Sequence, residues 1–187
     1  MIMWRVMLYV VDYVVHGVTV LDNIMYVVCD ESSTIRLYST DTHSPLDVVI
    51  NVEGMRFPRD IVVCRDDRQL YVADSFCIWR VSVSDDTYVK WLSTESRTDI
   101  FHVDTALSVT SRRLLVTSWW PSRRLRQYST TDRQLLRVVE LPQYVVYVFH
   151  GVETTRGTFV VGHRGTSQDE RQYAVSELFS FVVALKS

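Results

Sequence analysis

The chain has 187 residues and a formal net charge of −2 at pH 7, so it fits one ordinary domain without a broad attraction to nucleic acid or to anionic membranes. Hydrophobic residues make up 47% and charged residues 22%, which is typical of a soluble globular protein. Valine is abundant while glycine and proline are sparse, and β-branched side chains favour strands.

Residues 1–20, MIMWRVMLYVVDYVVHGVTV, form the stretch of the chain that most resembles a signal or a membrane anchor. Arg5, Asp12 and His16 interrupt it, and its longest apolar run, from Val6 to Val11, is too short to span a bilayer. We therefore expect a strand here and no membrane partner.

The three cysteines, Cys29, Cys64 and Cys77, are an odd number and show no CxxC spacing. This pattern disfavours a disulfide framework or a zinc site and favours buried free thiols in a reducing compartment. We therefore expect a cytoplasmic protein.

One apolar motif recurs four times along the chain. Its copies are MYVVCD with Tyr26, LYVAD with Tyr71, LLVTS with Leu115 and TFVVG with Phe159, at spacings of 45, 44 and 44 residues. A short run precedes each copy, as GVTVL does from Gly17, and a second run follows it, as TIRLYS does from Thr34. A further run closes each of the first three copies. Each unit therefore predicts four short strands in about 44 residues, which is typical of a β-propeller blade.

The repeat has a physical reason, because one small twisted sheet cannot cover both of its faces and stacked blades bury them against each other. In runs such as IRLYS and IWRVS, we expect the apolar side chains to point at neighbouring blades and the Arg to point elsewhere. The predicted blades cover roughly residues 16–52, 58–93, 104–141 and 150–187 of a single domain spanning 1–187. The alternative is a β-sandwich with accidental spacing.

The segment FPRDIVVCRDDRQLYVADSFCIWRVSV, residues 57–83, resembles an NHL repeat, a propeller family. It departs from that family at residues 75–77, where the usual Gly-Asn-His-Arg turn is missing, and the other three copies match only in pattern. A WD-repeat-like propeller is the close alternative. The matching residues are Pro58, Asp60, Ile61, Leu70, Tyr71, Val72, Ala73, Asp74, Ile78 and Arg80.

The resemblance implies a propeller that usually has six blades and serves as a binding platform for proteins, RNA or small ligands. Since about four blades are visible, the expected fold is an all-β, partial propeller, with a four-bladed closed ring as the alternative. Residues 3–14 would supply an outer strand that completes the last blade, or a remnant of a preceding one. The rest of a propeller or a second copy would then be a partner.

The sequence contains no Gly-rich phosphate loop, no nucleophile elbow and no metal-ligand spacing, so we expect no enzyme, no cofactor and no metal. Four residues just before the innermost strands are expected at one mouth of the propeller channel: His16, Arg59, Asp104 and His150. They would bind a polar ligand or an ion, or else hydrogen-bond the local backbone as turn residues.

A second candidate site is the segment SWWPSRRLR, with Trp119, Trp120, Arg123, Arg124 and Arg126. Residues 112–137 contain seven Arg and one acid, whereas residues 21–60 contain seven acids and three Arg. The Trp side chains would stack on RNA bases while the Arg side chains contact phosphates, or the segment would bind a peptide through cation–π contacts. The alternative is that the Trp residues pack against the neighbouring blade and the Arg residues are simply solvated.

The function expected from the sequence is a non-enzymatic interaction module for a protein or peptide partner. RNA binding through residues 118–126 is the alternative. A lactonase-like propeller hydrolase is a third reading, and it would require metal ligands that converge on the channel.

Overall fold

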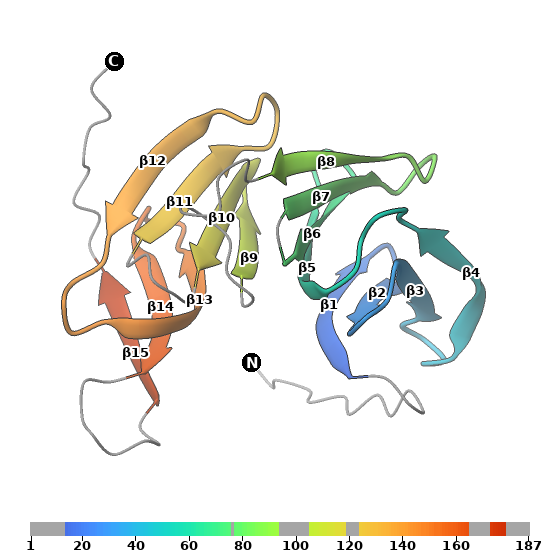
Figure 1. Ribbon diagram of the computed structural model, residues 1–187, viewed down its shortest axis with the longest axis horizontal. Helices are drawn as coiled ribbons and strands as arrows, with labels where there is room; N and C mark the ends of the chain where they lie inside the picture. Colours follow the sequence, from blue (N-terminus) through green and yellow to red (C-terminus); the bar gives the residue numbers. More distant parts are fainter. Residues whose placement is uncertain (1–13, 76, 94–104, 119–123, 165–172, 179–187) are drawn as a thin grey trace.

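The computed structural model describes residues 14–75, 77–93, 105–118, 124–164 and 173–178. These residues form fifteen β-strands in antiparallel sheets and contain no helix, so the prediction of an all-β fold built from four-stranded units is confirmed (Figure 1). A search of the same residues finds no helix with the length and apolar character that crossing a membrane requires.

Each sheet consists of strands that are consecutive in sequence, and we call the four sheets blades 1 to 4. Blade 1 contains β1 (Val15–Leu21), β2 (Ile24–Cys29), β3 (Thr34–Ser39) and β4 (Pro45–Asn51). Blade 2 contains β5 (Pro58–Cys64), β6 (Gln69–Asp74), β7 (Cys77–Ser82) and β8 (Tyr88–Ser93). Blade 3 contains β9 (Thr105–Thr110), β10 (Arg113–Ser118), β11 (Arg124–Ser129) and β12 (Leu135–Glu140). The described part of blade 4 contains β13 (Val146–Glu153), β14 (Phe159–Arg164) and β15 (Tyr173–Leu178).

Two-residue turns close the inner hairpins of blades 1 and 3. Asp22 and Asn23 have φ of 49° and 61°, and Ser111 and Arg112 have φ of 44° and 59°. Two successive positive φ values are the signature of a type I′ turn, whose twist matches that of the flanking strands. These turns fix the register of the hairpins and place Arg112 at the end of blade 3.

The innermost strands pack against one another in chain order, β1 on β5, β5 on β9 and β9 on β13. Gly17 lies at the first of these contacts, because a Cβ atom on this residue would come within 2.7 Å of the backbone nitrogen of Ile61. In the described ranges, no comparable contact joins β13 to β1, so the four blades follow one another as an arc (Figure 1). The outer-strand prediction for residues 3–14 lies almost entirely outside the described residues.

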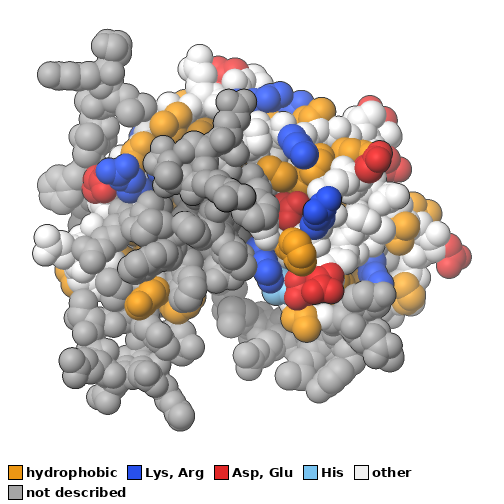
Figure 2. All heavy atoms as spheres, in the orientation of Figure 1, with side chains coloured by type: hydrophobic (Ala, Val, Ile, Leu, Met, Phe, Trp, Pro, Cys, Tyr) orange, Lys and Arg blue, Asp and Glu red, His pale blue; other side chains and the backbone are white. Residues whose placement is uncertain are grey.

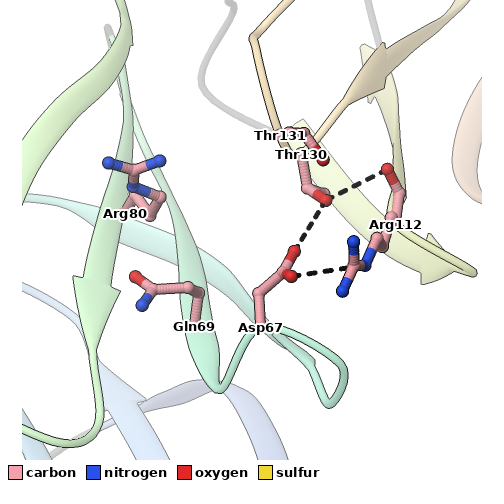
Figure 3. A pocket seen from close by; sticks show the side chains of 6 residues that line it. All are labelled: Asp67, Gln69, Arg80, Arg112, Thr130 and Thr131. Carbon is pink, nitrogen blue, oxygen red and sulfur yellow. Dashed lines mark hydrogen bonds and ion pairs between the residues drawn. The ribbon is translucent and has the colours of Figure 1, made fainter.

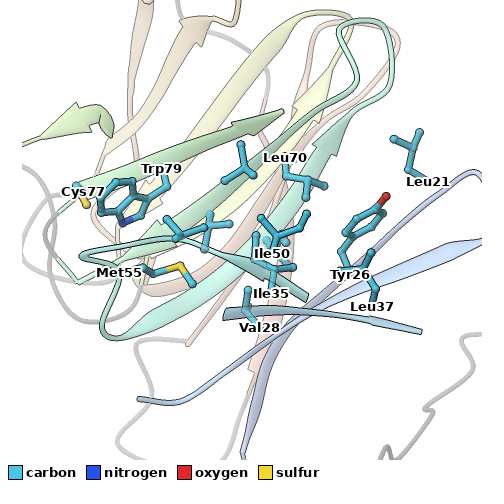
Figure 4. Close-up of a cluster of buried hydrophobic side chains, with 14 residues drawn as sticks. Leu21, Tyr26, Val28, Ile35, Leu37, Ile50, Met55, Leu70, Cys77 and Trp79 are labelled. Atoms are coloured by element: carbon cyan, nitrogen blue, oxygen red, sulfur yellow. The ribbon is translucent and has the colours of Figure 1, made fainter. Parts of the chain in front are cut away.

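Hydrophobic clusters fill the spaces between the blades. Tyr26 and Val28 of blade 1 meet Leu70 and Trp79 of blade 2 in the largest cluster (Figure 4). A second cluster joins blades 2 and 3, and a third joins blades 3 and 4. Full burial of one such side chain stabilises the fold by about 1.5–3 kcal/mol. The stacking predicted from the repeat is therefore also where the core lies.

All three cysteines are free and buried, as their spacing predicts. Burial raises the pKa of the Cys77 thiol to about 12, with the nearby Asp74 carboxylate raising it further. Burial also raises the pKa values of Cys29 and Cys64. The thiols are therefore parts of the core rather than reactive groups.

Candidate functional site

The predicted channel-mouth residues fall into two groups in the structure. Nη1 of Arg59, at the start of β5, lies 3.3 Å from Nε2 of His16, at the start of β1. Both atoms lie 3.6 Å from Oδ1 of Asp30, which follows β2 and was missed by sequence reasoning. Figure 2 shows one histidine side chain beside basic and acidic side chains on the face that it draws. The cluster joins blades 1 and 2 and balances the Arg59 charge internally.

Asp60 lies next to this cluster and links blade 2 to blade 3. Its Oδ1 accepts the N–H of Ile61 at 2.8 Å, and its Oδ2 accepts the N–H of Leu107 at 2.7 Å. Burial raises the pKa of this carboxyl, while the two backbone hydrogen bonds and the nearby His150 lower it. Since both carboxylate oxygens accept backbone N–H groups, the role of Asp60 is to connect blade 2 to blade 3.

His150, on β13, is exposed and lies near Asp60 rather than in the His16 cluster. Asp104 lies outside the described residues. Among the residues that are described, no group of three or more His, Cys, Asp or Glu side chains is arranged to hold a metal ion. The structure thus brings together two of the four predicted residues, His16 and Arg59.

The predicted Trp/Arg site is described only in part, because Trp119, Trp120 and Arg123 lie outside the described residues. Nε of Arg124 lies 2.5 Å from Oε1 of Glu140, and both side chains are half exposed. Arg126 is buried. The pairing of Arg124 leaves this part of the segment less able to contact an external phosphate.

Other arginines of the basic stretch are paired as well. Arg112 pairs with Asp67 at 3.3 Å, and Arg113 and Arg137 both pair with Glu153. Figure 2 shows basic and acidic side chains interspersed over the described part of one face. The charge excess read from the sequence is therefore largely balanced by contacts between strands and between blades.

An open pocket lies between blades 2 and 3, at the end of the blades where the β5–β6, β9–β10 and β11–β12 turns meet (Figure 3). Its volume is about 290 Å³, and its lining residues are Asp67, Gln69, Arg80, Arg112, Thr130 and Thr131. A second pocket of about 200 Å³ adjoins it, since Gln69 and Arg80 line both. Sequence reasoning did not identify this site.

Hydrogen bonds fix one wall of the pocket. Oγ1 of Thr130 donates to Oδ2 of Asp67 at 3.1 Å, and the Arg112 guanidinium pairs with the other oxygen of the same carboxylate. Below them, the Tyr71 hydroxyl donates to the backbone oxygen of Thr130 at 3.4 Å, and burial raises the pKa of this hydroxyl. This wall is therefore rigid, and its carboxylate is already occupied (Figure 3).

The opposite wall consists of Gln69 and Arg80 (Figure 3). Arg80 is paired across the β6–β7 ladder with Tyr71, and Gln69 is paired with Ser82, so all four side chains share one face of blade 2. Neither Gln69 nor Arg80 makes a side-chain hydrogen bond or an ion pair within the ranges that the structure describes. Both are half-buried.

The position of Arg80 corrects an expectation from the sequence. The Arg of IWRVS was expected to point away from the neighbouring blades, but it lies on the same face as Ile78, which packs against blade 3. This face is apolar from Ala73 to Tyr71 and becomes polar only at its end. The motif RQLYVADSFCIWRVSV did contain both Gln69 and Arg80, but only the neighbouring blade turns them into a pocket wall.

No protein-family model matches the sequence, and no curated protein matches it. Among solved structures, the chain is similar to the crystal structure of the computationally designed Ika4 protein, with a TM-score of 0.61 and 12% identity over 90% of this chain and 93% of that chain. It is also similar to a chain in the crystal structure of a Nidogen/Laminin complex, with a TM-score of 0.62 and 15% identity. That match covers 82% of this chain, which spans 58% of the length of the matched chain. At these identities the likeness concerns the fold alone, and it supports the all-β arrangement of four-stranded sheets.

Proposed function

We propose that the chain is a non-enzymatic propeller module that binds a peptide segment of a partner protein in the pocket between blades 2 and 3. The observation that carries this proposal is the pocket itself, whose Gln69 and Arg80 side chains present donors that have no partner among the described residues. A cytoplasmic location and a relationship to NHL-repeat propellers belong to the same proposal.

The size and shape of the site favour a peptide. Ligand pockets for whole cofactors and drug-sized molecules occupy roughly 300–1,000 Å³, so a pocket of about 290 Å³ suits one or two side chains. The adjoining pocket extends the site along Arg80 towards Thr87 and Tyr88, which gives it the elongated outline that an extended chain needs. Its mixed polar lining is typical of the rim of a protein interface.

The arrangement of charge favours a peptide over RNA. Affinity for nucleic acid depends on cations that are free to neutralise phosphates. In the basic stretch, Arg112, Arg113, Arg124 and Arg137 already pair with acidic side chains. An RNA ligand would have to compete with those contacts, whereas a peptide can use the pocket as it stands.

The test is selection from a displayed library of random linear peptides, with a variant that fills the pocket. Thr131 is exposed and lines the pocket, so Thr131→Trp should abolish the binding of the selected peptides. Thr155→Trp is the matched control, because Thr155 is also exposed but belongs to blade 4. Peptides that bind both variants equally, or a library that yields no binders while RNA binds at low salt, would overturn the proposal.

A further inference from the structure

The interface between blades 3 and 4 contains a buried carboxylate held by three side chains. The Glu153 side chain, at the end of β13, is only 1% exposed. Its Oε1 lies 3.3 Å from Nη1 of Arg113 and also pairs with Arg137, and its Oε2 accepts Nε2–H of Gln127 at 2.7 Å. Gln127 in turn accepts Nε–H of Arg137 at 2.7 Å. Blade 3 thus presents an amide and two guanidinium groups to one acid from the next blade.

Blade 2 presents the same kinds of group at the same places. The first residue of the second strand is Arg113 in blade 3 and Gln69 in blade 2. The residue paired with the third position of that strand is Gln127 in blade 3, opposite Leu115, and Arg80 in blade 2, opposite Tyr71. The amide and the guanidinium have exchanged strands, but both still face the following blade.

The two interfaces differ in the acid and in the outer strand, where Val89 is paired with Arg80 in blade 2 and Arg137 is paired with Gln127 in blade 3. Glu153 lies on the face of blade 4 that packs against blade 3, where it is paired with Phe159 of the cluster between these two blades. On the face of blade 3 that packs against blade 2, the corresponding position is Val109. It is paired with Leu114 and packs against the hydrophobic cluster between these two blades. Blade 3 therefore has no carboxylate at this position. The pocket lies where Gln69 and Arg80 of blade 2 face blade 3 (Figure 3).

The carboxylates that do line the two pockets are engaged elsewhere. Asp67 accepts from Thr130 and pairs with Arg112. Asp85 accepts the backbone N–H of Thr87 at 3.3 Å and its hydroxyl at 2.9 Å. Arg80 is left half-buried, and a charge in that state is stabilised by a hydrogen-bonded counter-ion.

We infer that this pocket binds the carboxylate of a Glu or Asp side chain supplied by the partner peptide, held by the Arg80 guanidinium and the Gln69 amide as Glu153 is held inside the molecule. The inference rests on the proposed function and names the chemistry that the pocket selects. The residues lining the larger pocket include two arginines and one aspartate, a balance that one further carboxylate neutralises.

The test compares matched small probes on the intact chain. In an NMR titration, acetyl-glutamate methylamide should cause saturable shifts of the Gln69 side-chain amide and of Arg80 Nε–H. Acetyl-glutamine methylamide, which has the same shape without the charge, should cause none. A titration with inorganic phosphate distinguishes a site for carboxylate from a site for phosphate. Phosphate binding tighter than that of the glutamate probe would overturn the assignment to a carboxylate.

Three variants complete the test. Arg80→Gln should weaken binding of the glutamate probe by about tenfold or more, and Arg80→Lys, which keeps the charge but not the fork of donors, should weaken it less. Arg156→Gln, at an exposed position on blade 4, should leave it unchanged. Thermal unfolding of each variant confirms that the fold persists.

The two proposals can fail separately. One outcome is that selected peptides lose binding to Thr131→Trp and yet bind the wild type equally well after every Glu and Asp in the peptide is changed to Gln or Asn. This result would overturn the carboxylate assignment but would still support the peptide-binding function. A failure of all peptides to depend on the pocket would overturn the function itself. Equal binding of the glutamate probe by the wild type and by Arg80→Gln would likewise end the assignment.

Discussion

Oδ2 of Asp60 accepts the backbone N–H of Leu107 across the boundary between blades 2 and 3, at a distance of 2.7 Å. The same carboxylate accepts the N–H of Ile61, so one half-buried side chain completes the hydrogen bonding of two strands. A carboxylate in this position has an energetic cost, because burial disfavours its charged form. The contact therefore links the packing of the inner strands to pH.

We expect Asp60 to lower the stability of the chain as pH rises above about 3.8, the ordinary pKa of this group. Burial raises its pKa in the folded chain, so the folded state holds the proton more tightly than the unfolded state does. The stability that Asp60 contributes is fully present below the unfolded pKa and is lost as pH rises through the folded pKa.

The measurement is the free energy of unfolding by urea from acid to neutral pH, for the wild type and for Asp60→Asn. Subtracting the variant removes the opposite effect of exposed carboxyls such as Asp85 and Asp132, whose hydrogen bonds lower their pKa values. The difference should fall as pH rises. A difference that stays level or increases over this range would contradict the expected direction.

Glu153→Gln should destabilise the chain by about 3–5 kcal/mol, because it removes a buried carboxylate and leaves Arg137, whose side chain is only 18% exposed, without its counter-ion. Glu140→Gln is the matched control, since it breaks the half-exposed pair with Arg124 and should cost at most about 1 kcal/mol. Denaturant unfolding of both variants checks the contrast. Similar losses for the two would mean that Glu153 is not the centre of the blade 3–4 interface.

Gly17→Ala should destabilise the chain by about 1–3 kcal/mol, because its Cβ atom would come within 2.7 Å of Ile61 nitrogen and 3.0 Å of Asp60 Cα. Both neighbours are backbone atoms, so relief requires the two inner strands to move apart. Gly162→Ala serves as the control, since among the described residues the nearest atom to its Cβ would be the oxygen of His150, at 3.8 Å. Thermal unfolding that shows no difference between them would argue against the close approach of blades 1 and 2.

None of the three thiols should react with a disulfide reagent such as DTNB while the chain is folded. Cys29, Cys64 and Cys77 are buried, and burial raises the pKa of each, so little thiolate is present at neutral pH. All three should react in denaturant. Rapid labelling of any of them in the native chain would show that the core opens locally around that residue.

The sequence predicts the strands and their grouping well, because both depend on local signals. The alternation around Tyr71 and the polar turns on either side of it lie within one repeat. The register of the repeats also places His16 and Arg59 at the same end of their strands, and the structure has their nitrogens 3.3 Å apart.

Contacts between blades are less predictable. Asp30 joins the His16 cluster from a different turn, and Glu153 reaches Arg113 from a strand 40 residues later in the chain. The face on which Arg80 lies could be derived from alternation, but whether Arg80 has an acid partner within the described ranges depends on which residue blade 3 places opposite it. The pocket therefore emerges only once the packing of the two blades is known.

The order of strands within the sheets also bears on how the chain is made. Each described strand pairs only with strands adjacent to it in sequence, and the blades pack in chain order. A ribosome synthesising the chain from its N-terminus therefore releases each sheet complete before the next one begins. Blade 1 is ready as a template when β5 emerges, and each later blade extends the stack. Vectorial assembly of this kind limits the time for which any hydrophobic blade face lacks its neighbour.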